Sequence, residues 1–139
     1  MSIFGNLFKR KPALVAEDPV FGPLTHDQGI WTFTPKRPGP GFMITIAAPQ
    51  TGPTPEQRDF FERVRPKLAD LHLRARDFIR SRADEPVNLS RLSLYSVETG
   101  DEEETKRREF VLELSDEDAI VIHSVSFRAD EPVDYGFDD

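Results

Sequence analysis

The sequence contains no cysteine, which excludes several kinds of chemistry at once. Without thiols the 139-residue chain can form no disulfide, carries no cysteine nucleophile and offers no thiolate ligand to zinc. A domain of this length buries roughly 68–70% of its unfolded surface, so it needs no such cross-link to fold. The absence of cysteine fits a reducing compartment, and we predict a cytoplasmic protein.

Long hydrophobic runs are also missing. The longest are Ala13–Ala16 and Ala119–Ile122, whereas a membrane-spanning helix requires about 20 apolar residues. The N-terminus does not read as a secretory signal either, because Lys9, Arg10 and Lys11 follow the first apolar residues instead of preceding them.

The short motifs of several enzyme classes are absent. The sequence has no G-x-S-x-G nucleophile motif, no P-loop and no G-x-G-x-x-G motif. The carboxylates of 101–104 and 116–118 lack the alternating spacing of an EF-hand loop. His72 has no histidine or glutamate at metal-binding spacing on its helix, and we interpret it as a packing residue. We predict no metal, no cofactor and no assigned catalytic residue.

Positive charge is scarce in the C-terminal third. Residues 92–139 contain four basic and fifteen acidic residues, and the whole chain has a formal net charge of −7. Such a region disfavours nucleic acid and favours a cationic protein partner. The candidate binding residues are the carboxylates of the two acidic clusters: Glu98, Asp101, Glu102, Glu103, Glu104, Asp116, Glu117 and Asp118.

The first twelve residues form an amphipathic pattern. Their apolar side chains share one helical face and are followed by three cations, which suits weak docking on a membrane surface or on a partner. We predict an amphipathic segment at 1–12, a linker at 13–18 and a single domain at 19–139. The candidate docking residues are Ile3, Phe4, Leu7 and Phe8.

The clearest local signal is a helix that starts after Thr54. Threonine at the N-cap, Pro55 at the first helical position and Gln57 at the third form a capping box. An apolar stripe keeps its phase across Pro66, so we predict one long kinked helix that ends near Arg82. The stripe consists of Phe60, Val64, Leu68, Leu71, Ala75 and Phe78.

Three strands are predicted on each side of this helix. The ranges are 20–24, 30–34 and 42–48 before it, then 91–97, 108–114 and 119–127 after it. The stretch "ETGDEEETK" is interpreted as a charged hairpin loop. The fold class is therefore α+β, with antiparallel sheet(s) in β3–α–β3 order and the long helix packed on one face.

The hexapeptide "RADEPV" occurs twice, at Arg82–Val87 and Arg128–Val133. The flanking sequences differ, so it is not a duplicated unit. We interpret each copy as the end of a different element, since the residue before a proline is biased away from the helical region. A linear motif read by a partner is the alternative.

Two histidines support an enzymatic alternative. His26 is expected in a solvated turn beside Asp27, and His123 is expected to be partly buried in the last strand. A histidine paired with a carboxylate can act as a general base, so a small hydrolase using His123 or His26 stays open.

The chain resembles a loosely defined group of small bacterial proteins of unknown function. The resemblance rests on "DPVFGPL" at Asp18–Leu24, "GIWTF" at Gly29–Phe33, and a closing hairpin from "EFVLELSDED" into "IVIHSVSF". This chain has Ile122 where the group has a glycine before the histidine. Some proteins of this style are immunity partners of bacterial toxins, which implies a role as an immunity- or inhibitor-like partner of a cationic protein.

The sequence therefore leaves three functions open. The first is a non-enzymatic protein-binding module that uses the acidic clusters, the second is the hydrolase, and the third is a peripheral-membrane adaptor that uses the N-terminal segment.

Overall fold

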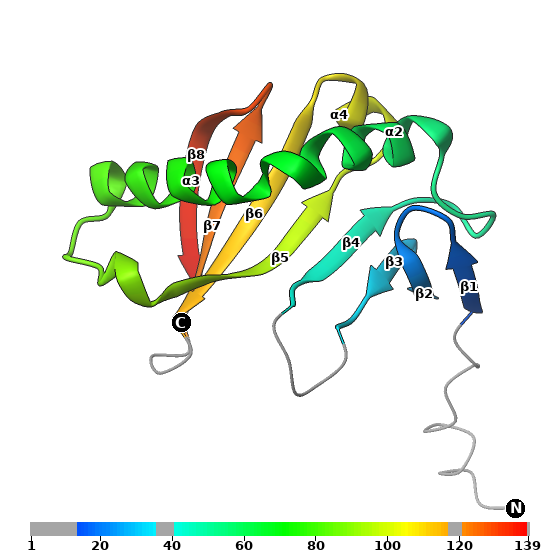
Figure 1. Ribbon diagram of the computed structural model, residues 1–139, viewed down its shortest axis with the longest axis horizontal. Helices are drawn as coiled ribbons and strands as arrows, with labels where there is room; N and C mark the ends of the chain where they lie inside the picture. Colours follow the sequence, from blue (N-terminus) through cyan, green and yellow to red (C-terminus); the bar gives the residue numbers. More distant parts are fainter. Residues whose placement is uncertain (1–13, 36–40, 117–120, 139) are drawn as a thin grey trace, which may run out of the picture.

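The protein is an α+β molecule built on one mixed eight-stranded sheet. The computed structural model describes residues 14–35, 41–116 and 121–138. The strands lie side by side in the order in which they occur in the chain, and every neighbouring pair is antiparallel except β4 and β5, which are parallel (Figure 1). The strands are β1 (Leu14–Asp18), β2 (Gly22–Asp27), β3 (Ile30–Phe33), β4 (Met43–Ala47), β5 (Leu92–Thr99), β6 (Glu109–Asp116), β7 (Val121–Arg128) and β8 (Glu131–Asp138).

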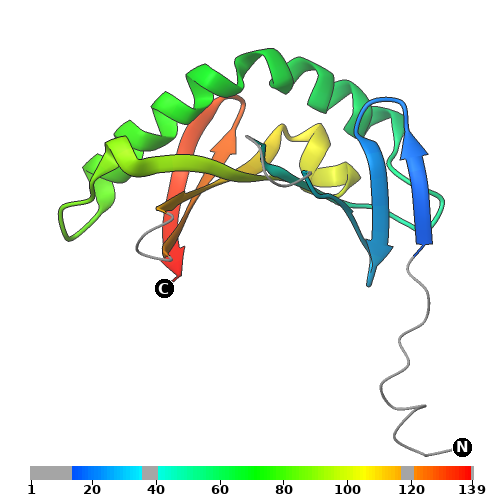
Figure 2. The same ribbon diagram turned by 60° about the horizontal axis from the view of Figure 1, so that its bottom comes forward.

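The predicted long helix is present with the expected ends. It consists of α2 (Pro55–Val64), a 3-10 turn (Arg65–Lys67) and α3 (Leu68–Arg82). Thr54 and Gln57 form the reciprocal capping box, as predicted. The three segments continue in one direction as a bowed rod over one face of the sheet (Figure 2). Pro66 lies in the 3-10 turn, where the tighter winding accommodates the missing N–H without reversing the chain.

The rod explains why the sheet is mixed. It connects β4 to β5, which are neighbours, and a helical crossover between adjacent strands returns the chain to the same end of the sheet. The second strand must then run parallel to the first. The expected antiparallel sheet is therefore wrong at this one pair.

The core lies between the rod and the sheet. Five stripe residues from Phe60 to Ala75 are buried as predicted, but the sixth position is taken by Ile79, which is fully buried. Phe78 is only partly buried, and the guanidinium of Arg82 lies 4.8 Å from the centre of its ring. The sheet contributes buried residues from its central strands, including Ile46, Val97, Leu112, Leu114 and Val125.

Two edge strands were not predicted, so four strands precede the rod and four follow it. The predicted linker 13–18 forms β1 over Leu14–Asp18, which pairs with β2. The second "RADEPV" copy does not simply end a strand. Ala129 and Asp130 adopt positive φ angles of 51° and 68° at the tight β7–β8 turn, and the copy continues into β8. The first copy does end α3, where Ala83 is the C-cap.

The predicted charged loop contains a short helix. This helix, α4 (Glu102–Lys106), connects β5 to β6 and lies beside α2. Asp101 accepts a hydrogen bond from the Glu104 amide, and the Glu104 carboxylate accepts one from the Asp101 amide. The acidic run therefore contains a second capping box, and this box orders a segment that charge alone would leave as a loop.

Candidate functional site

The sheet face opposite the rod carries the site. Side chains alternate along each strand, so the neighbours of the buried core residues point away from the rod. We call this the open face, and it carries Thr45 of β4, Glu98 of β5, Val111 and Glu113 of β6, and Ser126 of β7. A cavity of about 590 Å³ lies along it, and its lining includes Thr45, Glu98, Val111, Ser126, Arg128 and Asp134.

Two carboxyl groups meet on the open face. Glu98 and Glu113 come from neighbouring strands and are diagonal neighbours, two residues out of register with each other. Burial, the charge of Glu113 and a hydrogen bond to Glu113 raise the pKa of Glu98 to about 7. Glu98 is therefore about half protonated near neutral pH, because ionising it beside another carboxyl group is unfavourable.

A serine holds one of the two carboxyl groups in place. The Ser96 hydroxyl donates a hydrogen bond to the Glu113 carboxylate, and Ser96 is completely buried. A bulge between Leu94 and Ser96 sets the register that brings these two side chains together. The hydrogen bond therefore fixes the position of the Glu113 carboxyl group beside Glu98.

The rim of the cavity is acidic. Arg128 is the one basic residue that lines it in the part of the chain that the structure describes. Its guanidinium is 3.1 Å from the Glu109 carboxylate, which also accepts a hydrogen bond of 2.9 Å from Arg107. Glu98, Glu104 and Asp134 add negative charge to the same cavity, so a cation is the charge that it favours.

The predicted acidic binding residues do not form one surface. Glu98 belongs to the open face, and Asp101 to Glu104 lie at or on α4 beyond the end of β5. Asp116 lies at the opposite end of β6, which spans roughly 25 Å at about 3.3 Å per residue. Glu117, Asp118 and the predicted docking residues Ile3, Phe4, Leu7 and Phe8 lie outside the described residues.

Of the two candidate histidines, His26 lies elsewhere than predicted and His123 lies where it was predicted. His26 is buried in β2 against Trp31, with 4.7 Å between ring centres, because the turn is formed by Gln28 and Gly29. His123 is buried in β7, as expected. Its Nδ1 is hydrogen-bonded to the Tyr135 hydroxyl at 2.8 Å, in the place where the hydrolase alternative expects a carboxylate.

Sequence reasoning did not find Glu113 and Ser96. Glu113 lies between the inward-facing Leu112 and Leu114. The alternation along the strand therefore predicts that the Glu113 side chain points outward. Its place beside Glu98 depends on the register of β5 against β6, which includes the bulge. A register of this kind is not visible in one strand alone.

Comparison of the chain with family models, with curated proteins and with solved structures finds no match. The resemblance to small bacterial immunity-like proteins therefore stays a prediction. Within the described ranges, no helix combines the length and the apolar character that crossing a bilayer requires.

Replacing Glu98 with glutamine is expected to stabilise the fold at pH 8 by about 1 kcal/mol and to have no effect at pH 4. The folded-state pKa of Glu98 is raised, so its favourable contribution is present below the unfolded value of 4.5 and is lost as the pH rises through about 7. The figure is kept small because the Glu98 side chain, although partly shielded by its neighbours, is still reached by solvent that screens its charge. Urea unfolding at both pH values measures the effect, and Glu102→Gln on α4 is the control that should show no such dependence.

Proposed function

We propose that the chain is a protein-binding module whose open face accepts a cationic segment of another protein beside Glu98 and Glu113. The observation that carries the proposal is the pair of neighbouring carboxyl groups, Glu98 and Glu113, of which Glu98 lines a cavity with an acidic rim. A lysine or arginine side chain placed there replaces the proton and pairs with both carboxylates. More specifically, we propose that the protein is immunity- or inhibitor-like and covers a cationic partner.

The acidic rim contributes to the rate of association more than to affinity. Exposed carboxylates such as Asp134 attract a cationic partner over distances of about a Debye length, and salt screens this attraction. At the Glu98–Glu113 pair a bound cation offsets the repulsion between two neighbouring carboxyl groups, so this is the part of the site where a cation gains most. Binding is therefore expected to release a proton.

An arginine-containing peptide tests the proposal. The control peptide carries citrulline at every arginine, which keeps the shape and removes the charge. Affinity for the arginine peptide is expected to rise about tenfold between pH 6 and pH 8, because one proton with a pKa of about 7 must leave. Isothermal titration calorimetry in two buffers of different ionisation enthalpy measures the released proton directly.

Matched variants separate this site from net charge. The pair Glu98→Gln and Glu113→Gln is expected to weaken binding about tenfold and to abolish proton release. The pair Glu102→Gln and Glu103→Gln removes two carboxylates from α4 and is expected to change affinity less than about twofold. Equal losses in both double variants would show attraction to net charge only and would overturn the proposal.

A further inference from the structure

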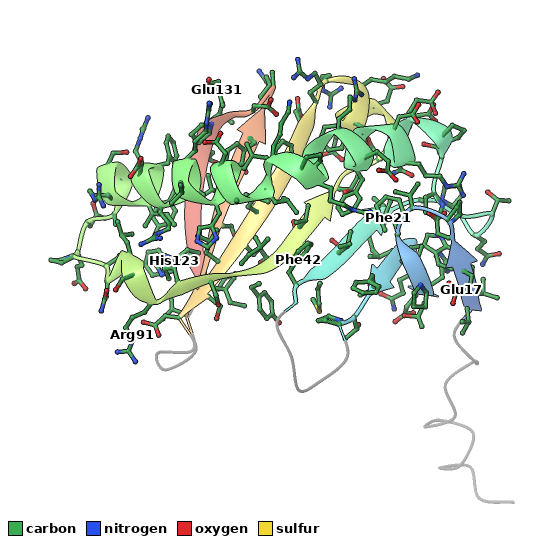
Figure 3. All side chains as sticks on the ribbon, viewed as in Figure 1. Glu17, Phe21, Phe42, Arg91, His123 and Glu131 are labelled. Carbon is green, nitrogen blue, oxygen red and sulfur yellow. The ribbon has the colours of Figure 1, made fainter. Side chains whose placement is uncertain are left out.

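A second cavity lies on the other side of the sheet, at the end of α3. Its volume is about 540 Å³, within the range of small-molecule sites. One wall is the segment 83–88 that follows α3, and the other is formed by His123 of β7 with Tyr135 and Phe137 of β8. His123 lies beneath the C-terminal half of α3 (Figure 3). We propose that this cavity binds a small organic cation, a protonated amine carried on an aromatic or apolar body.

The aromatic wall supplies the surface for the body of the ligand. The ring centres of His123 and Tyr135 are 5.9 Å apart and their planes differ by 10°, and Tyr135 and Phe137 are 6.2 Å apart at 25°. Phe137 is 60% exposed, whereas five of the nine phenylalanines that the structure describes are buried. A ligand ring that covers Phe137 extends the stack and removes apolar surface from water.

The hydrogen bond between His123 and Tyr135 keeps this wall rigid and uncharged. Burial lowers the pKa of His123, although the nearby Asp116 opposes this. Burial and the charge of Asp84 raise the pKa of Tyr135. Both side chains are therefore neutral at pH 7, and the wall presents ring faces that attract a cation.

The charge around the cavity selects the sign of the ligand. Asp84, Glu85 and Asp116 line it, and no basic side chain does so among the residues that the structure describes. The carboxylates of Asp84 and Glu85 come from the segment after α3, opposite the aromatic wall. A ligand that lies on the rings therefore meets negative charge on its other side, which favours an ammonium group and disfavours a carboxylate or a phosphate.

This site is independent of the open face. The cavity lies between the rod side of the sheet and the segment after α3, and none of its lining residues belongs to the cavity beside Glu98. Failure of one proposal therefore leaves the other standing.

Three indole probes of similar size but different charge test the inference. Tryptamine is a cation, tryptophol is neutral and indole-3-propionate is an anion. Two-dimensional amide NMR titrations of the full chain measure both affinity and position. We expect tryptamine to bind at least about tenfold more tightly than tryptophol. Tryptamine is expected to shift the amide signals of His123, Tyr135 and Phe137. Indole-3-propionate is expected to cause no shift of these signals.

Variants of the two walls complete the test. Phe137→Ala and Asp84→Asn are each expected to weaken tryptamine binding about five- to tenfold. Val133→Ala changes an exposed residue of the same strand that lines the other cavity, and it is expected to leave binding unchanged. Equal binding of tryptamine and tryptophol, or shifts outside this cavity, would overturn the inference.

A further arm of the titration identifies the source of the cation. A lysyl-tryptophan amide carries the same two groups as part of a peptide. Tighter binding of this peptide than of tryptamine supports recognition of a partner's side chains, and tighter binding of tryptamine supports a free amine. Binding of neither compound counts against the site.

Discussion

Replacing Gln57 with leucine is expected to lower the free energy of unfolding by about 2–5 kcal/mol. Gln57 is completely buried at the start of α2. Its amide nitrogen donates to the carbonyl oxygens of Ala47 at 2.7 Å and Gly100 at 2.9 Å, and its side-chain oxygen accepts from the Thr54 amide at 2.9 Å. Leucine fills the same space, so the loss comes from buried backbone groups left without partners.

Urea unfolding monitored by circular dichroism measures this loss. Glu62→Leu changes an exposed residue of the same helix to the same side chain, and it is expected to change stability by less than about 0.5 kcal/mol. Gln57→Glu keeps the shape but directs a carboxyl group at two carbonyl oxygens, so it is expected to be less stable at pH 7 than at pH 4. A Gln57→Leu protein as stable as the wild type would show that these hydrogen bonds contribute nothing.

The position of Gln57 connects the fold to the site. Ala47 ends β4 and Gly100 follows β5, so this one side chain joins the two parallel strands to the rod. Both residues also line the cavity beside Glu98. A buried polar side chain with every partner in place specifies one arrangement of these elements, and the carboxyl pair depends on that arrangement.

The rod was predictable because its signals are local. The capping box and the apolar stripe lie within one stretch of sequence, and each can be recognised without knowing the rest of the fold. The exchange of Phe78 for Ile79 in the buried position is a small departure. Both residues lie near the same face, and the packing of the sheet decides which one is covered.

The sheet was only partly predictable because its edges carry weak patterns. β1 and β8 bury few side chains, and six of the eight residues of β8, among them Val133 and Phe137, are exposed. The β7–β8 turn has alanine and aspartate at positive φ. Glycine or asparagine at these positions would have indicated a hairpin from the sequence. The parallel β4–β5 pair depends on which strands become neighbours, and no single strand contains that information.

The candidate site was also predictable only in part. The acidic character of Glu98 was readable from composition, whereas its pairing with Glu113 depends on a register with a bulge. The two acidic clusters are close in sequence, and the sequence alone does not show that a full strand separates them in the fold. The cavity at the end of α3 brings together the segment after α3 and the last two strands, about 40 residues apart in the chain.

Replacing Asp18 with alanine is expected to lower the free energy of unfolding by about 3 kcal/mol at pH 7. Asp18 is buried at the β1–β2 turn, within the "DPVFGPL" stretch. One carboxylate oxygen accepts from the amides of Val20 at 2.9 Å and Phe21 at 3.0 Å, and the other pairs with Arg58 at 2.8 Å. The carboxylate therefore holds β1 and the turn against α2, and the loss is expected to detach this edge of the sheet.

The pH dependence of this loss identifies its cause. Burial on its own would raise the pKa of Asp18, but the amide of Phe21, the guanidinium of Arg58 and the amide of Val20 together lower it. A lowered folded-state pKa contributes stability that is present above the unfolded value of 3.8 and is lost as the pH falls through the folded value. The difference in stability between wild type and Asp18→Ala is therefore expected to narrow as the pH falls below 3.8. Arg58→Gln, which removes only the partly exposed ion pair, is expected to cost about 1 kcal/mol. If Arg58→Gln cost as much as Asp18→Ala, the ion pair and not the two amides would be the main support of the turn.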